Sequence, residues 1–223
     1  MFSALKAIIW KDIVMEFKTK QMTSTMLVFS GLVIVIFSFA FTLSLEVLEQ
    51  VFPGMIWVAI IFSSILGLNR SFLLEKSNDC VQGLLLLPAD RTVIYLGKLI
   101  ANLLFVIVTQ IVIVPGFFLL FDYRFQGSLG MLILVLLVGI VGFIAIGTFL
   151  AALASNSRMS DMLLPIILFP VSVPLIIAGV ECTSFIFQGQ GFEAFSQWFY
   201  LMLVFDVIFL TIPYMLFDYV MEV

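Results

Sequence analysis

The sequence predicts an all-α integral membrane protein with six transmembrane helices, and its composition, its long apolar segments and the placement of its basic residues all favour this class. Of the 223 residues, 63% are hydrophobic and only 11% are charged, whereas soluble domains contain about 45–50% apolar and about 25% charged residues. This excludes an ordinary water-soluble domain, and also a disordered chain, which requires low hydrophobicity. The net charge of −4 provides no basic stripe for nucleic acid. We expect residues 1–223 to form a single transmembrane domain.

The first predicted element is an amphipathic helix from Phe2 to about Lys20, lying at the cytoplasmic surface of the membrane. Its apolar residues recur at the spacing i, i+3, i+4 and i+7, which places them on one helical face. A cleaved secretory signal is the alternative, but the basic region and the apolar run after it are both too long for one. The apolar face consists of Trp10, Ile13, Val14 and Phe17.

Six apolar segments follow, each long enough to cross about 30 Å of hydrocarbon as a helix. None shows the alternation of apolar and polar residues over about ten positions that is typical of a transmembrane β-strand. Only the last segment contains an ionisable residue near its middle, Asp206. The predicted spans cover about residues 26–45, 51–70, 98–121, 129–153, 162–180 and 198–217.

The basic residues orient these spans. Nine of the 10 Lys and Arg residues fall before the first span, between spans two and three, or between spans four and five, and Arg124 is the exception. Basic residues concentrate in cytoplasmic loops. The sequence therefore predicts a multi-pass protein with both termini in the cytoplasm.

The cytoplasmic segment between spans two and three predicts a short helix. Asn78 or Asp79 begins it, and Pro88 ends it at about Leu87. A helix this short is marginal in water by itself, so it must pack on something. Two interpretations are open: it lies on lipid headgroups, or its apolar centre and polar rim dock into an ATPase subunit that moves it. The candidate ATPase-coupling residues are Glu75, Asp79, Val81, Leu84, Leu85, Pro88, Asp90 and Arg91.

The sequence contains no pattern that indicates catalysis or metal binding. There is no His, the two Cys residues are far apart, and no phosphate-binding loop of the Walker type occurs. Without a nucleophile, a base and an orienting group in a recognisable pattern, we expect no enzyme activity in this polypeptide and no metal site.

Some residues within the spans have both a packing and a functional interpretation. A proline removes a helical hydrogen bond, so those of the fifth span predict either a kinked packing helix or a hinge. Asp206 is costly in hydrocarbon, about 2.5–3.5 kcal/mol, and predicts either a polar contact inside the bundle or a functional group. Trp57 is interpreted first as an aromatic residue of the outer membrane interface. The candidate hinge or pathway residues are Pro53, Trp57, Pro165, Pro170, Pro174 and Asp206.

A stripe of small residues in the fourth span predicts a close helix contact. Gly147, Ala151 and Ser155 recur every four residues, a spacing that lets two helices approach closely. The contact lies either within the subunit or in the seam of a permease homodimer.

Three stretches carry a resemblance to a known family. Residues 75–98, with their Leu run and Pro88, resemble the coupling segment of six-helix ABC exporter permeases. Phe52 to Ala59, FPGMIWVA, resembles the PGxxWVA signature of CcmB, the permease subunit of the cytochrome c maturation system. Residues 151–178 are similar to the fourth loop and fifth helix of that family. The resemblance extends from the first span to about Cys182.

The resemblance implies a permease subunit of the bacterial inner membrane that exports haem, or releases a haem chaperone, during c-type cytochrome biogenesis. It implies as partners an ABC ATPase subunit (CcmA-like), a CcmC-like haem-handling membrane protein, a haem chaperone and a second copy of the permease. ATP would be bound by the ATPase subunit, and haem is the candidate substrate. Three alternatives stay open: a generic ABC exporter permease for lipid, polysaccharide or drug, a non-transporting scaffold of the maturation complex, and a proton-coupled carrier.

Overall fold

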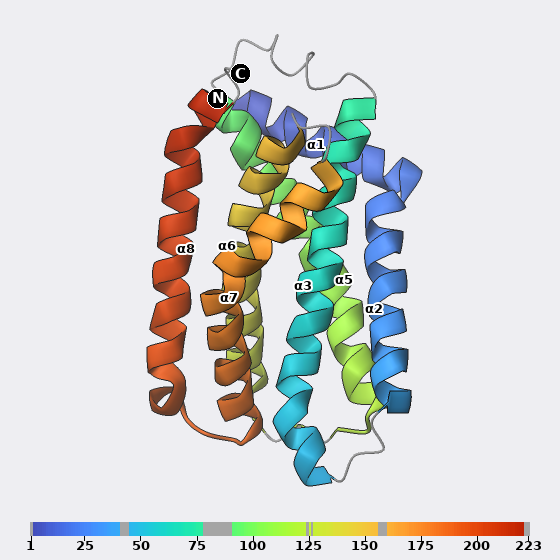
Figure 1. The fold of residues 1–223 in the computed structure, drawn as a ribbon, viewed down its shortest axis with the longest axis vertical. Coiled ribbons are helices and arrows are strands. Elements are labelled where there is room, and N and C mark those ends of the chain that lie inside the picture. The colour runs from blue at the N-terminus through green and yellow to red at the C-terminus, as the bar shows by residue number, and fades with distance from the viewer. Residues whose placement is uncertain are drawn as a thin grey trace.

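The computed structural model describes residues 2–40, 45–77, 91–123, 125, 127–155 and 160–220. All regular structure in these residues is α-helical, which confirms the predicted fold class. Six of the described helices are long and apolar enough to cross a membrane, and α1 lies across one end of the bundle that they form (Figure 1). The helices are α1 (Phe2–Thr19), α2 (Gln21–Ala40), α3 (Leu45–Ser77), α5 (Arg91–Leu120), α6 (Leu129–Ser155), α7 (Ser160–Phe187) and α8 (Phe192–Val220).

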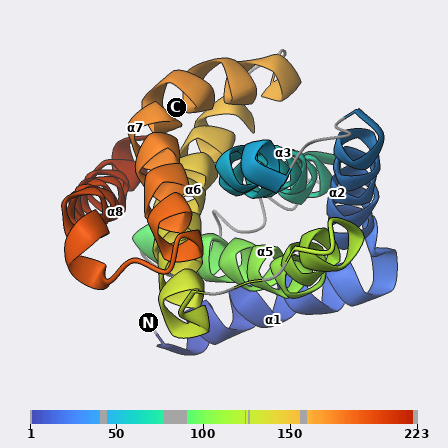
Figure 2. The same cartoon turned by 90° about the horizontal axis from the view of Figure 1, so that it is seen from below.

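Helices α3 and α6 form the centre of the bundle. Within their membrane-span windows, 72% of the α3 residues and 56% of the α6 residues are buried, against 22–33% for α2, α5, α7 and α8. The end-on view shows the same arrangement, with the other spans placed around this central pair (Figure 2). The outer helices therefore present apolar side chains outward, such as Val28 and Ile111, as lipid-facing helices do.

The first span lies earlier in the chain than the predicted range 26–45. Helix α2 begins at Gln21, and Leu45 already belongs to α3. The cause is a cap that hydropathy does not detect: the Glu16 carboxylate accepts hydrogen bonds from the backbone N–H groups of Met22 (3.2 Å) and Thr23 (2.7 Å). These groups have no partner inside the helix, so the cap stabilises a start before the apolar run begins.

The predicted fifth and sixth spans, which end at residue 180 and begin at residue 198, are too short. The link between α7 and α8 covers only residues 188–191, and it turns at Gly189, whose φ of 71° suits glycine. The helices continue past the glutamates near these ends because their inward faces stay packed. Cys182 (0% exposed) and Phe195 (1% exposed) are both buried between the two helices.

An aromatic cluster closes the end of the bundle opposite α1. Phe52, fully buried at the start of α3, lies within ring contact of five other aromatic side chains, and it stacks on Tyr123 with ring centroids 4.5 Å apart. Burial and the Glu49 carboxylate raise the pKa of the Tyr123 phenol, which keeps it neutral. The remaining rings of the cluster belong to Phe117, Phe118, Phe121, Phe125 and Phe187.

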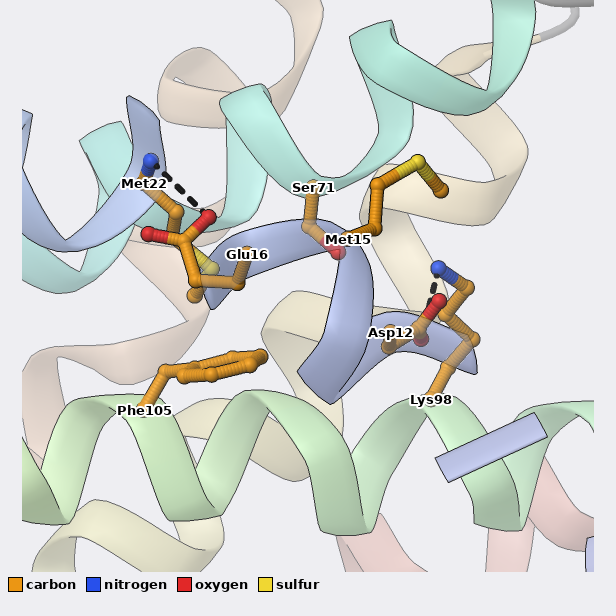
Figure 3. Close-up of a pocket in the computed structure, with 7 residues that line it drawn as sticks. All are labelled: Asp12, Met15, Glu16, Met22, Ser71, Lys98 and Phe105. Carbon is orange, nitrogen blue, oxygen red and sulfur yellow. Dashed lines mark hydrogen bonds and ion pairs between the residues drawn. The ribbon is translucent and has the colours of Figure 1, made fainter. Parts of the chain in front are cut away.

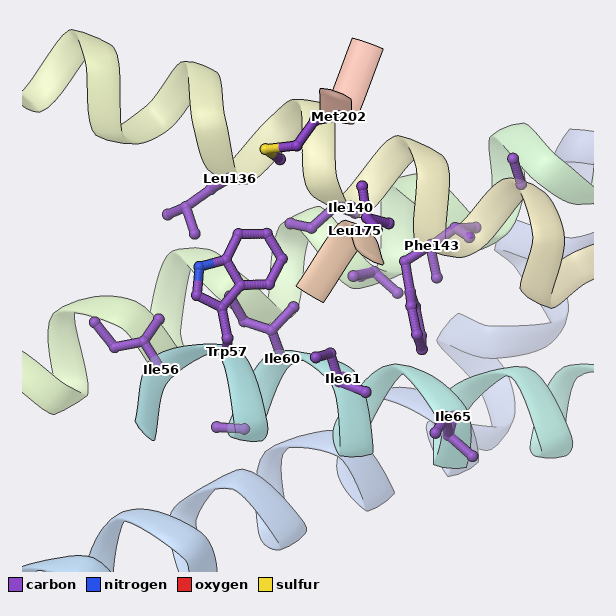
Figure 4. Packing of buried hydrophobic residues seen from close by; sticks show 14 of the residues in the cluster. Ile56, Trp57, Ile60, Ile61, Ile65, Leu136, Ile140, Phe143, Leu175 and Met202 are labelled. Carbon is purple, nitrogen blue, oxygen red and sulfur yellow. The ribbon is translucent and has the colours of Figure 1, made fainter. Parts of the chain in front are cut away.

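Trp57 is a core residue, and its interpretation as an outer-interface residue is wrong. Its indole is 1% exposed and lies between α3, α6 and α7 (Figure 4). A Cβ atom added to Gly139 or to Gly179 would collide with the indole ring, so these two glycines form the slot that accepts it. The indole Nε1 donates a hydrogen bond to Thr183 Oγ1 (3.0 Å), which satisfies its polar atom inside the bundle.

Two of the three residues in the small-residue stripe of α6 pack within the subunit, and the side chain of the third, Ser155, lies outside the described residues. A Cβ atom on Gly147 would collide with Leu68 of α3, and Ala151 is 4% exposed. Both residues are thus covered by helices of the same chain, and they are not available as the seam of a homodimer.

Candidate functional site: the anchor of α1 beside the coupling segment

Two membrane helices lead directly to the predicted coupling segment. Helix α3 continues to Ser77 and α5 begins at Arg91, so Glu75 lies in the last turns of α3. The remaining predicted coupling residues fall in 78–90, outside the described residues, and their role stays a prediction. They are Asp79, Val81, Leu84, Leu85, Pro88 and Asp90.

A buried ion pair fastens α1 to the first turns of α5. Lys98 Nζ lies 2.9 Å from Asp12 Oδ2, and the two side chains are only 3% and 8% exposed. Lys11 Nζ lies 3.3 Å from the other carboxylate oxygen of Asp12. Next to the pair, Ile8 fills the space above Gly97, where a Cβ atom would collide with it. Lys98 follows Arg91 by about two helical turns, so α1 is anchored close to the coupling segment.

A second acidic residue, Glu16, fastens α1 to α2. Its carboxylate makes the two hydrogen bonds that begin α2, and it points away from the ion pair toward α2 (Figure 3). Between Asp12 and Glu16 lies a cavity of about 20 Å³, room for about one water molecule. Its wall also includes Ser71 of α3 and Phe105 of α5. Helix α1 therefore connects to α5 and α2 through buried polar contacts and lies beside α3 as well.

Sequence reasoning missed this anchor. Asp12 and Glu16 are spaced i, i+4 and share one face, a spacing that was available as a signal. The predicted apolar stripe points elsewhere, since Trp10 is 68% and Phe17 is 74% exposed. Helix α1 thus packs its acidic face inward and leaves Trp10 and Phe17 outward. Its placement at a membrane surface stays a prediction that this orientation favours.

The candidate hinge residues occupy two different helices. Pro165, Pro170 and Pro174 all lie inside α7, whose upper half bends away from the bundle axis in Figure 1. Pro170 and Pro174 are exposed, so they face away from the helices of the same chain. Pro53 is buried near the start of α3, beside the aromatic cluster. A hinge at any of them stays a prediction.

Asp206 is 7% exposed and packs against α6. A Cβ atom on Gly142 would collide with Asp206 Oδ1, and this oxygen has no hydrogen-bond partner among the described residues. One turn away, Met202 and Trp57 meet at Gly139. The fold thus brings two of the candidate residues, Trp57 and Asp206, to one glycine-lined face of α6.

We expect Gly142→Ala to destabilise the protein by about 1–3 kcal/mol, because the added methyl group would force α6 and α8 apart at Asp206. Thermal unfolding of the purified protein in detergent measures this. The matched control is Gly130→Ala in the same helix, where a Cβ atom meets nothing closer than Ser128 Oγ at 3.9 Å. Equal unfolding midpoints for both variants would show that Asp206 does not pack tightly on α6.

In the described part of the chain, no group of three His, Cys, Asp or Glu residues could hold a metal ion. Among the buried polar groups of the anchor, Asp12 and Lys98 bind each other, and Glu16 binds the backbone N–H groups at the start of α2. These contacts connect α1 to both α5 and α2.

Together, the six apolar helices, with α1 anchored across one end of their bundle, define a multi-pass α-helical membrane protein. Its two central features are the buried anchor of α1 on α5 and α2 and the tightly packed α3–α6–α7 core. The chain belongs to the CcmB family, because the family model described as CcmB protein matches residues 3–219.

Named relatives agree with this family. The chain is 26% identical over 172 residues to Heme exporter protein B of Pseudomonas aeruginosa, covering 77% of each chain. It is 26% identical over 190 residues to Heme exporter protein B of Bradyrhizobium diazoefficiens, covering 84% of each chain. It is 25% identical over 148 residues to the Rhodobacter capsulatus protein of the same name, covering 66% of this chain and 67% of the relative.

Proposed function

We propose that this chain is the permease subunit of an ABC transporter that exports haem, or releases a haem chaperone, during c-type cytochrome biogenesis. The observation that carries the proposal is the CcmB family match over residues 3–219. The relatives named Heme exporter protein B support haem as the substrate, since they align over most of both chains.

In this proposal the chain moves and does not catalyse. A CcmA-like ATPase subunit binds and hydrolyses ATP, grips the segment 78–90, and pulls on the ends of α3 and α5. The Asp12–Lys98 ion pair supports this role, because it makes α1 and α5 move together near that segment. The prolines of α7 supply a hinge that lets the bundle change shape.

The proposed location is the bacterial inner membrane, with both termini in the cytoplasm. The basic residues of α1 and Lys98 lie at one end of the bundle, as cytoplasmic basic residues do. A CcmC-like protein and a haem chaperone complete the complex, and a second copy of the chain forms a homodimer. Because the sequence has no His, axial imidazole ligands for haem come from those other subunits.

We expect Leu84→Arg to abolish coupling, because an arginine at the apolar centre of the docking helix predicted from the sequence would be desolvated without a partner. The chain is expressed with its partner subunits, and the ATPase subunit recovered on an affinity tag is quantified beside the yield of c-type cytochrome. Both should fall at least tenfold.

The matched control is Leu129→Arg, which places the same charge at an exposed position where α6 begins. It should retain the ATPase subunit and the cytochrome yield. Undiminished ATPase recovery with Leu84→Arg would contradict the docking role.

A second comparison tests transport against the alternatives. A partner ATPase that binds but does not hydrolyse ATP should stop cytochrome maturation, whereas a pure scaffold would continue to support it. A Soret absorption band in the purified complex supports haem as substrate. Its absence, with a retained lipid or polysaccharide, would assign the chain to a generic exporter.

A further inference from the structure

An apolar groove lies in the corner where α1, α2 and α5 meet. Its volume is about 470 Å³, within the range of about 300–1,000 Å³ typical of small-molecule sites. Leu27 of α2 and Leu104 and Val108 of α5 contribute apolar wall, and Phe17 of α1 also lines the groove. Leu104 is 42% and Val108 is 54% exposed, so the groove opens outward. Because α2 and α5 are membrane spans, it opens toward lipid.

The end of the groove next to α1 is polar and cationic. Lys20, at the junction of α1 and α2, lines the groove together with Thr23 and Ser24. Lys18, in the last turn of α1 and two residues before Lys20, is exposed nearby but does not line the groove. Among the described residues, neither lysine forms an ion pair. An apolar wall with one cationic end suits an amphiphile that has an acyl chain and a negative headgroup.

The acidic residues of α1 do not cancel this positive charge. Asp12 is paired with Lys98 inside the protein. Glu16 also lines the groove, but its carboxylate is turned to the start of α2, where it accepts hydrogen bonds from the backbone N–H groups of Met22 and Thr23. The N-terminal dipole of α2 further offsets the Glu16 charge. The exposed charges of α1 and its junction with α2 are therefore lysines alone, which attract anionic lipid by about 1 kcal/mol each.

We propose that this groove holds an anionic phospholipid of the leaflet in which α1 lies. An acyl chain packs against Leu27, Leu104 and Val108, and the phosphate lies at Lys20, with the exposed Lys18 adding a second positive charge close by. The bound lipid fills the corner between α1, α2 and α5 and stabilises the placement of α1 over the bundle. This inference requires that α2 and α5 span the membrane, and it does not depend on haem export.

The test measures lipid retention on the purified chain by native mass spectrometry, with phosphatidylglycerol and phosphatidylcholine as probes. We expect the parent protein to retain phosphatidylglycerol at least fivefold more than phosphatidylcholine. The double variant Lys18→Gln/Lys20→Gln should lose this preference, since each lysine is worth roughly a factor of five in affinity. Lys6→Gln, an exposed lysine at the other end of α1, is the matched control and should keep it.

A second pair of variants tests the apolar wall. Val108→Trp should fill the groove and reduce retention of both lipids at least fivefold. Ile111→Trp, on the same helix and more exposed, does not line the groove and should leave retention unchanged. Size-exclusion profiles and helical circular dichroism establish that each variant is folded.

Three results would overturn the proposal. Equal retention of both lipids by the parent protein would remove the anionic preference, and a preference that survives Lys18→Gln/Lys20→Gln would place the headgroup elsewhere. A haem Soret band that is lost with Val108→Trp and kept with Ile111→Trp would reassign the groove to the substrate.

Discussion

Replacing Asp12 with Asn is expected to destabilise the protein by about 3–5 kcal/mol, because it leaves the Lys98 ammonium group buried without its counter-charge. Both side chains are nearly inaccessible, at 8% and 3% exposure, so solvent and salt screen the pair little. Thermal unfolding in detergent should show a large drop in the midpoint. Limited proteolysis should cleave α1 first, since the ion pair holds this helix on α5.

Two controls separate the ion pair from a general loss of charge. Glu193→Gln removes an exposed acid at the start of α8 and should leave the unfolding midpoint unchanged. The double variant Asp12→Leu/Lys98→Met replaces both charges with apolar groups of similar size and should recover most of the lost stability. If Asp12→Asn has the same unfolding midpoint as the parent protein, the ion pair contributes nothing to the anchor.

The same ion pair connects stability to the proposed function. When α1 detaches, the first turns of α5 lose their buried partner close to the coupling segment. We therefore expect the cytochrome yield of Asp12→Asn to fall while the ATPase subunit still co-purifies, because the docking segment itself is unchanged. Loss of the ATPase subunit together with the yield would mean that the anchor shapes the docking surface.

Replacing Trp57 with Ala is expected to cost about 3–5 kcal/mol, because the indole fills the space between three helices at 1% exposure. The change also removes the hydrogen bond to Thr183 Oγ1. Thr183 keeps its second contact, a hydrogen bond donated to the backbone carbonyl of Gly179 (2.7 Å), so the cavity dominates the loss. Thermal unfolding in detergent again measures the effect.

The glycine slot gives an independent measurement of the same contact. Gly179→Ala should destabilise the protein, because the new methyl group would collide with the Trp57 ring and the neighbouring helices leave the ring little room to move. Gly54→Ala in α3 is the matched control, since nothing lies within 4 Å of its Cβ position. In the Trp57→Ala background, Gly179→Ala should have little further effect. If Gly179→Ala destabilises the Trp57→Ala variant as much as it destabilises the parent protein, the glycine does not form a slot for the indole ring.

Local properties of the sequence were enough to predict the fold class. Helix length and apolar content depend on neighbouring residues alone, and a membrane requires about 20 apolar residues for each crossing. The six spans were therefore predicted correctly in number and order, and the family resemblance at FPGMIWVA agreed with the family match. The span ends were less accurate. The cap by Glu16 lies outside the apolar run, and the ends of α7 and α8 are held by packing.

Which side of each helix faces inward was decided by the tertiary structure alone. In a soluble helix, polarity distinguishes the two faces, but lipid tails are as apolar as a protein core, so a membrane helix carries little such signal. Trp57 and Trp10 illustrate this. The first is buried between Gly139 and Gly179 and the second is exposed, although both are aromatic residues expected at a membrane surface.

For the charged residues, too, the sequence predicted the approximate position and the tertiary structure decided the burial. The sequence predicted that Asp12, Glu16 and Lys98 lie near one membrane boundary. Only the packing of α1 across α2 and α5 decided that these three are buried, while Lys18 and Lys20 remain outside. A charge can be buried only where a partner from another helix meets it, and the meeting of two helices is a property of the whole fold.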